Sequence, residues 1–95
     1  MNSNCFESIW DAIEDTPEEA ENMKLRSILM MALSEHIRRN ELNQSQAARL
    51  FGVTQPRISD IKRGKINLFS LDSLVKMAVT AGLRVELTVS ELEAT

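Results

Sequence analysis

Cysteine and histidine are nearly absent from this chain of 95 residues, which contains one of each, Cys5 and His36. A lone cysteine cannot build a disulfide framework, and a structural zinc ion needs four Cys or His ligands, so the sequence excludes both. A chain without disulfides is expected in the cytoplasm, where thiols stay reduced. Cys5 has no basic sequence neighbours that would activate its thiol, so we expect it to be unreactive.

Long apolar runs and catalytic motifs are also missing. No apolar stretch approaches the roughly 18 residues of a membrane span, and the N-terminal residues lack the basic flank and apolar core of a secretion signal. The three glycines are isolated, which excludes a glycine-rich phosphate loop, and His36 has no partner nucleophile at a motif spacing. We therefore expect no enzyme, no cofactor, no small-molecule substrate and no membrane association, with His36 solvated or partly packed.

The formal net charge of −3 conceals three regions of different sign. Residues 1–23 contain seven Asp or Glu and no Lys or Arg, which gives −7. Residues 24–66 contain nine Lys or Arg against three Asp or Glu, which gives +6, and the remaining residues sum to −2. This asymmetry indicates that the middle of the chain faces a polyanion, whereas the N-terminal segment faces either a basic partner or water.

Two helices are predicted in the N-terminal part of the chain. Apolar residues at helical spacing predict a first helix over 5–15. Thr16, Pro17 and Glu19 form a strong start signal, with Glu19 completing a capping box, so we expect a long second helix that ends near Asn40. Its apolar stripe comprises Leu25, Ile28, Leu29, Ala32, Leu33 and Ile37, widened by Met30 and Met31 toward the first helix or a second chain.

Two short helices joined by a tight turn are predicted next. The first, 44–51, begins with a capping box formed by Asn43 and Gln46 and stops at Gly52. The second, 55–63, follows directly after the turn. Two short helices joined by a three- or four-residue turn containing glycine form the helix-turn-helix unit.

The C-terminal third predicts a change from helix to strand. The second short helix, 55–63, is expected to have Thr54 as its N-cap and to end at Gly64. A last helix is expected to begin after its N-cap Ser70 and to stop at Gly82. Residues 83–90 then alternate strictly between apolar and polar, which is typical of a half-buried strand. Because a single strand needs a backbone partner, we expect it to pair with the same strand of a second copy. The dimerisation candidates are Val85, Leu87 and Val89.

The stretch 42–65, LNQSQAARLFGVTQPRISDIKRGK, resembles the helix-turn-helix of the Xre/Cro-cI family of repressors. The family's pattern positions are occupied by Gln44, Ala48, Gly52, Ile58 and Ile61. With the flanking helices the resemblance covers roughly 25–81. The expected fold is a single, mainly α-helical domain of five helices, with a lambda-repressor-like core over 24–82, the helix-turn-helix unit at 43–64 and one terminal strand at 83–90.

Recognition helices present their first turns to the major groove, so exposed side chains there are expected to read bases. The base-contacting candidates are Gln55, Arg57, Ser59 and Asp60. Arg57 can pair with guanine, Gln55 with adenine, and Asp60 with a cytosine amino group, although an ion pair between Arg57 and Asp60 is the alternative role for those two. Phosphate contacts are expected from Gln44, Ser45, Thr54, Lys62, Arg63 and Lys65.

The whole chain is similar to the small Xre-type antitoxins of the HigA kind, which neutralise a toxin and repress their own operon. The expected protein is a homodimer whose partners are double-stranded DNA with a palindromic operator and a basic toxin of the RNase type. Aromatic anchors within the acidic segment resemble interface hot spots, which makes the toxin-binding candidates Phe6, Trp10, Asp11 and Glu14. Two alternatives stay open: a plain Xre-type repressor of a phage or mobile element without a toxin, and a helix-turn-helix used solely as a protein adaptor.

Overall fold

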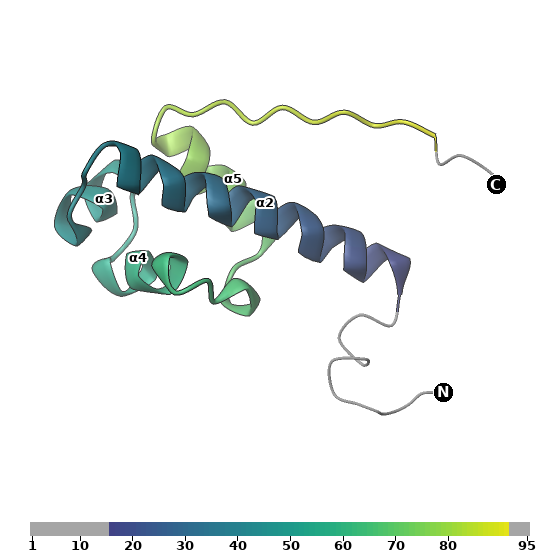
Figure 1. The fold of residues 1–95 in the computed structure, drawn as a ribbon, viewed down its shortest axis with the longest axis horizontal. Helices are drawn as coiled ribbons and strands as arrows, with labels where there is room; N and C mark the ends of the chain where they lie inside the picture. The colour runs from purple at the N-terminus through teal and green to yellow at the C-terminus, as the bar shows by residue number, and fades with distance from the viewer. Residues whose placement is uncertain (1–15, 92–95) are drawn as a thin grey trace.

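The computed structural model describes residues 16–91 and builds them almost entirely from helices (Figure 1). The helices are α2 (Pro17–Arg39), α3 (Gln44–Phe51), α4 (Gln55–Lys62), the short 3-10 helix η1 (Ile66–Leu68) and α5 (Leu71–Thr80). In Figure 1, α3 lies near the C-terminal end of the long helix α2. Helix α2 packs mainly against α5, and α3 packs mainly against α4. The helix predicted over 5–15 lies outside the described residues.

The predicted helix starts are largely confirmed by hydrogen bonds. The Thr16 hydroxyl accepts from the Glu19 amide at 3.1 Å, which is one of the two bonds of the capping box expected there. Asn43 and Gln46 form the complete box ahead of α3. Thr54 is the exception: it stands at the N-cap position of α4, but its side chain makes no capping hydrogen bond.

The hydrophobic core draws on all four α-helices. The largest fully buried side chains are Leu33 from α2, Phe51 from α3, Ile58 and Ile61 from α4, and Leu74 from α5. Around them pack the smaller buried residues that let the helices approach one another, Ala47, Ala48 and Ala78. Burial of these apolar surfaces, about 25 cal/mol per Å², supplies the main force that holds α4 in place.

The core face of α2 differs from the predicted stripe. The buried residues are Met30, Leu33 and Ile37, whereas Ile28 is 54% exposed and Met31 is 69% exposed. The prediction gave α2 one wide apolar face, but the helices packed against it cover a narrower one. Apolar side chains therefore remain on the outside of α2.

The C-terminal strand predicted over 83–90 is not present in the described part of the chain. After Gly82 the backbone runs extended back along the molecule (Figure 1), and residues 83–91 contain no strand. The physical reason is that a ladder needs a second strand, and residues 16–91 offer none. Within these residues the structure has the four α-helices that were expected there, together with the 3-10 helix η1, but not the strand.

The left-handed turns that end α3 and α4 generate a testable difference. Gly52 has φ 72° and Gly64 has φ 70°, so an L-residue at either position costs about 1–2 kcal/mol. A Cβ atom on Gly52 would also lie 3.3 Å from Cγ2 of Thr80, whereas one on Gly64 would meet nothing within 4 Å. We expect Gly52→Ala to lower the free energy of unfolding more than Gly64→Ala in urea denaturation.

Thr80→Ser supplies the matched control, because it removes the methyl group that the new Cβ would approach. In that background the two glycine substitutions should cost the same. A difference that persists without the Thr80 methyl group would contradict the proposed contact.

Candidate nucleic-acid interface

The turn between α3 and α4 is fixed by backbone hydrogen bonds and by burial on both sides. Gly52 adopts the left-handed conformation that lets its own amide donate to the Ala48 carbonyl, and the Val53 amide donates to the same oxygen at 3.0 Å. Beyond the turn, Ile58 and Ile61 bury one side of α4. The two helices are thereby held as one rigid unit.

The burial of Ile58 and Ile61 determines which side of α4 faces outward. Successive residues of an α-helix are rotated by about 100°, so the side opposite these isoleucines carries Pro56, Ser59 and Asp60. Pro56 is exposed, and Ser59 and Asp60 are partly exposed. Gln55, which is exposed, lies at the edge of this outer face. Three of the four base-contacting candidates thus lie on or beside one outward surface.

Arg57 is placed differently from the other three candidates. Its Nη1 atom donates to the Leu68 carbonyl oxygen at 3.0 Å, and its Cζ atom lies 4.2 Å from the centroid of the Phe69 ring. The helix geometry explains this position, because Arg57 precedes the buried Ile61 by four residues and shares its side of α4. The alternative ion pair with Asp60 is not among those formed by the described residues.

The phosphate-contacting candidates occupy the ends of the two short helices. Gln44 starts α3, Thr54 precedes α4, and Ser45 accepts a hydrogen bond from Arg49 at 3.3 Å. At the other end of α4, three basic side chains are exposed and, within residues 16–91, none of them forms an ion pair. They are Lys62, Arg63 and Lys65. Arg63 and Lys65 thus place positive charge at the C-terminal end of the outer face, and Lys62 lies beside that face on the side toward α2.

The segment after α4 contains contacts that could not be predicted from the sequence. Arg26 of α2 donates from Nη1 to the carbonyl oxygens of Ile66 at 3.1 Å and Phe69 at 3.2 Å. Neither η1 nor these contacts follow from any motif. The spacing of Arg57 from Ile61 was the one available signal that its side chain points toward the core.

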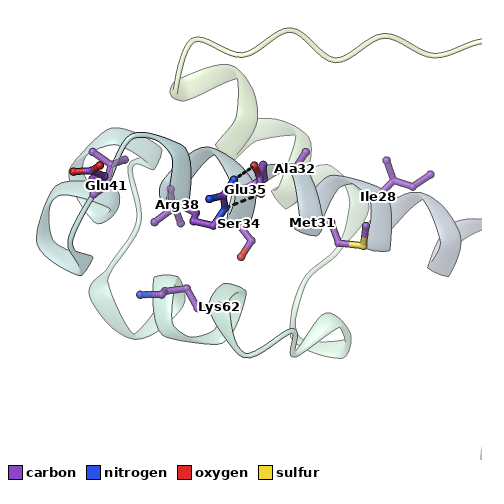
Figure 2. Close-up of a pocket in the computed structure, with 10 residues that line it drawn as sticks. Ile28, Met31, Ala32, Ser34, Glu35, Arg38, Glu41 and Lys62 are labelled. Carbon is purple, nitrogen blue, oxygen red and sulfur yellow. Dashed lines mark hydrogen bonds and ion pairs between the residues drawn. The ribbon is translucent and has the colours of Figure 1, made fainter.

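An open groove, separate from the outer face of α4, runs between the outer side of α2 and the end of α4 (Figure 2). Exposed Ile28 and Met31 line it, and Lys62 reaches toward it from α4. Glu35 and Arg38 form an ion pair at its rim. The hydrogen bond from Arg38 lowers the pKa of Glu35, and the same bond raises the pKa of Arg38. Within the described part of the chain, no group of three or more His, Cys, Asp or Glu side chains is placed to hold a metal ion.

The remaining candidates are less constrained by the structure. Val85, Leu87 and Val89 are 39%, 69% and 84% exposed along the extended C-terminal segment. The toxin-binding candidates Phe6, Trp10, Asp11 and Glu14 lie outside the described residues. Within the described part, none of the helices is long and apolar enough to cross a membrane.

Comparison with known proteins agrees with this geometry. The sequence matches a helix-turn-helix domain family over residues 12–90. A solved structure described as an XRE-family transcriptional regulator is similar to the chain, with a TM-score of 0.70 and 28% sequence identity, over 78% of this chain and 83% of the other. No curated protein matches. Since the match spans most of the sequence, the chain belongs to this helix-turn-helix domain family.

Proposed function

We propose that this protein is an XRE-type DNA-binding transcriptional regulator that reads its operator with the outer face of α4. The observation that supports the proposal best is the arrangement of that helix. Its isoleucines are buried on one side, polar side chains are exposed on the other, and basic residues follow at its C-terminal end. The similar solved structure, described as an XRE-family regulator, supports the same function.

The proposed base contacts follow from the hydrogen-bonding groups on that face. Gln55 can donate to and accept from adenine, Asp60 can accept from the amino group of cytosine, and Ser59 suits either base. Pro56 has no polar group and can pack against a thymine methyl. The guanidinium group of Arg57 is already engaged within the protein, by its hydrogen bond to the Leu68 carbonyl.

A net charge of −3 does not oppose DNA binding by this surface. At physiological salt the Debye length is about 8 Å, so the phosphates respond mainly to the charges nearest to them. Those charges are Lys62, Arg63 and Lys65, beside the outer face of α4. Affinity should therefore fall steeply with salt despite the acidic overall composition.

The extended C-terminal segment supports the proposal that the regulator is a homodimer. Beyond Leu83, whose amide donates to the Ala78 carbonyl at 2.9 Å, the exposed backbone is available to a second chain. Pairing of two such segments would cover Val85, Leu87 and Val89 and satisfy the backbone groups. Two recognition helices about 34 Å apart would then read a palindromic operator.

The finer proposal is an antitoxin that represses its own operon and neutralises a basic toxin of the RNase type. Its support is the charge of −7 over residues 1–23 together with the aromatic residues Phe6 and Trp10, beside Asp11 and Glu14. A plain Xre-type repressor, in which residues 1–15 have no toxin partner, is the alternative. A small basic open reading frame next to the gene favours the antitoxin.

DNA recognition is tested by fluorescence anisotropy on the DNA upstream of the protein's own gene across a salt series. Gln55→Ala should reduce discrimination at one base pair by about 1–3 kcal/mol. Lys62→Ala should weaken binding to all sequences alike and reduce the salt slope by roughly one. Lys76→Ala, which removes an equal charge from an exposed position on α5, is the control and should change neither. A wild-type protein that shows no preference over unrelated DNA would disprove the proposal.

Strand pairing is tested by light scattering after chromatography. Leu87→Asp would place a charge within the apolar face of the paired segments and should shift the protein toward monomer. Thr88→Asp adds the same charge on the other face of the segment and should leave the dimer intact. Equal effects of the two substitutions would argue against pairing in this register.

The toxin-binding proposal is tested by deleting residues 1–15 and co-expressing the product with the neighbouring basic protein. Growth rescue should be lost, whereas operator affinity should stay at the wild-type level. If rescue and DNA binding fall together, residues 1–15 serve folding rather than toxin capture.

A further inference from the structure

Two arginines from different helices converge on the short segment that follows α4. Arg26, on α2, donates to the carbonyl oxygens of Ile66 and Phe69, at 3.1 and 3.2 Å. Arg57, on α4, donates to the Leu68 carbonyl at 3.0 Å and lies over the Phe69 ring at 4.2 Å. Three of the four carbonyl groups from Ile66 to Phe69 are thus bound by guanidinium groups.

The chemistry of this segment explains why arginine suits both positions. The Ile66 carbonyl already accepts from the Phe69 amide at 3.2 Å, but a single turn of 3-10 helix leaves its last carbonyl groups without partners inside the helix. The two bonds from Arg26 are partly buried, where carbonyl groups need donors, whereas the bond from Arg57 to Leu68 is exposed. A guanidinium group offers several donors in a fixed plane and can also stack on an aromatic ring. Phe69 is 2% exposed, so the ring beneath Arg57 is anchored in the core. Arg26 is itself oriented by Asn22, whose Oδ1 atom accepts from its Nε at 2.7 Å.

The segment so bound controls one edge of the proposed DNA surface. The Lys65 amide donates to the Asp60 carbonyl of α4 at 3.0 Å, and the Lys65 carbonyl accepts from the Leu68 amide at 3.1 Å. Lys65 therefore stands between the end of α4 and η1, and its backbone is tied to both. Whatever fixes η1 also fixes the direction in which the Lys65 side chain leaves the protein.

We propose that Arg26 and Arg57 are positioning residues, which together we name the arginine clamp, and that Arg57 is not a base reader. The clamp holds residues 65–69 against α2 and α4, and so presents Lys65 to the DNA backbone beside the outer face of α4. This inference rests on the proposed function as a DNA-binding regulator. Arg26 lies on a different helix from the base-contacting candidates. The proposal nevertheless predicts that substituting Arg26 lowers DNA affinity as much as substituting Arg57.

The position of Arg57 on α4 carries the argument against base reading. A base reader must extend from the outer face, where Pro56, Ser59 and Asp60 lie, but Arg57 lies on the side of Ile61. To reach a base it would have to give up both the hydrogen bond to Leu68 and the contact with Phe69. As part of the clamp, Arg57 keeps both contacts when DNA binds.

The test measures Arg57→Ala, Arg26→Ala and the double variant against the upstream DNA and against a panel with one base pair changed at a time. We expect each single substitution to lower operator affinity roughly threefold to tenfold, on the scale of one ordinary intramolecular hydrogen bond, because the effect on DNA is indirect. The loss should be equal across the panel, so that the order of base preferences is kept. The double variant should lose less than the product of the two single losses, because both arginines hold the same segment.

A base-reading role gives a different pattern. Arg57→Ala would then lose discrimination at one base pair alone, and Arg26→Ala would bind like the wild type. That result would overturn the clamp while leaving the proposed function intact. Absence of any operator preference in the wild-type protein would instead disprove the proposed function, whatever the variants do. Lys76→Ala again controls for the loss of one positive charge.

A second measurement on the wild-type protein keeps the test independent of whether the variants fold. The Phe69 ring shifts the NMR resonances of the Arg57 side chain, because the guanidinium group lies above it. We expect these shifts to persist when saturating operator DNA is added. Loss of the ring-current shift on binding would show that Arg57 leaves the clamp, and would contradict the proposal.

Discussion

The burial of Ile58 and Ile61 is the constraint on which the arrangement of the proposed DNA surface depends. An eight-residue helix makes few hydrogen bonds of its own, so packing must determine how α4 is rotated about its axis. With these two side chains in the core, the outward positions of Pro56, Ser59 and Asp60 follow from helical geometry alone. The same rotation turns Arg57 toward Phe69. The packing of these two isoleucines therefore leaves Pro56, Ser59 and Asp60 on the outer face, and places Arg57 where it contacts Phe69.

The sequence predicted the helices well because their signals are local. The capping box at Asn43, the Pro17 start and the glycine after each short helix act within one turn of the chain, and the structure places the helix ends within a residue or two of the predicted limits. Gln55 is exposed and Asp60 partly exposed, and both stay predicted base contacts. These conclusions needed no knowledge of what lies far away in the sequence.

Features that depend on distant partners could not be predicted in the same way. The contacts of Arg26 with Ile66 and Phe69 join residues 40 and 43 positions apart, and nothing near Arg26 signals them. The alternation over 83–90 correctly indicates an extended backbone, but strand formation depends on a second strand that residues 16–91 do not contain. The exposed Ile28 and Met31 show the same limit, because periodicity identifies an apolar face without saying how much of it another helix covers.

The chemistry of the outer face separates specificity from affinity. Its centre carries a proline, a serine and an aspartate, none of which is positively charged, and the positive charges lie at its rim, on Lys62, Arg63 and Lys65. In the proposed complex, an aspartate near DNA would be repelled by the backbone unless it accepted a hydrogen bond from a base amino group, so Asp60 would act against most sequences. A rim of fixed basic side chains then has to supply the attraction. Under the proposed function, the direction of Lys65, and hence the segment that the arginines bind, would therefore matter more than it would beneath a face rich in basic residues.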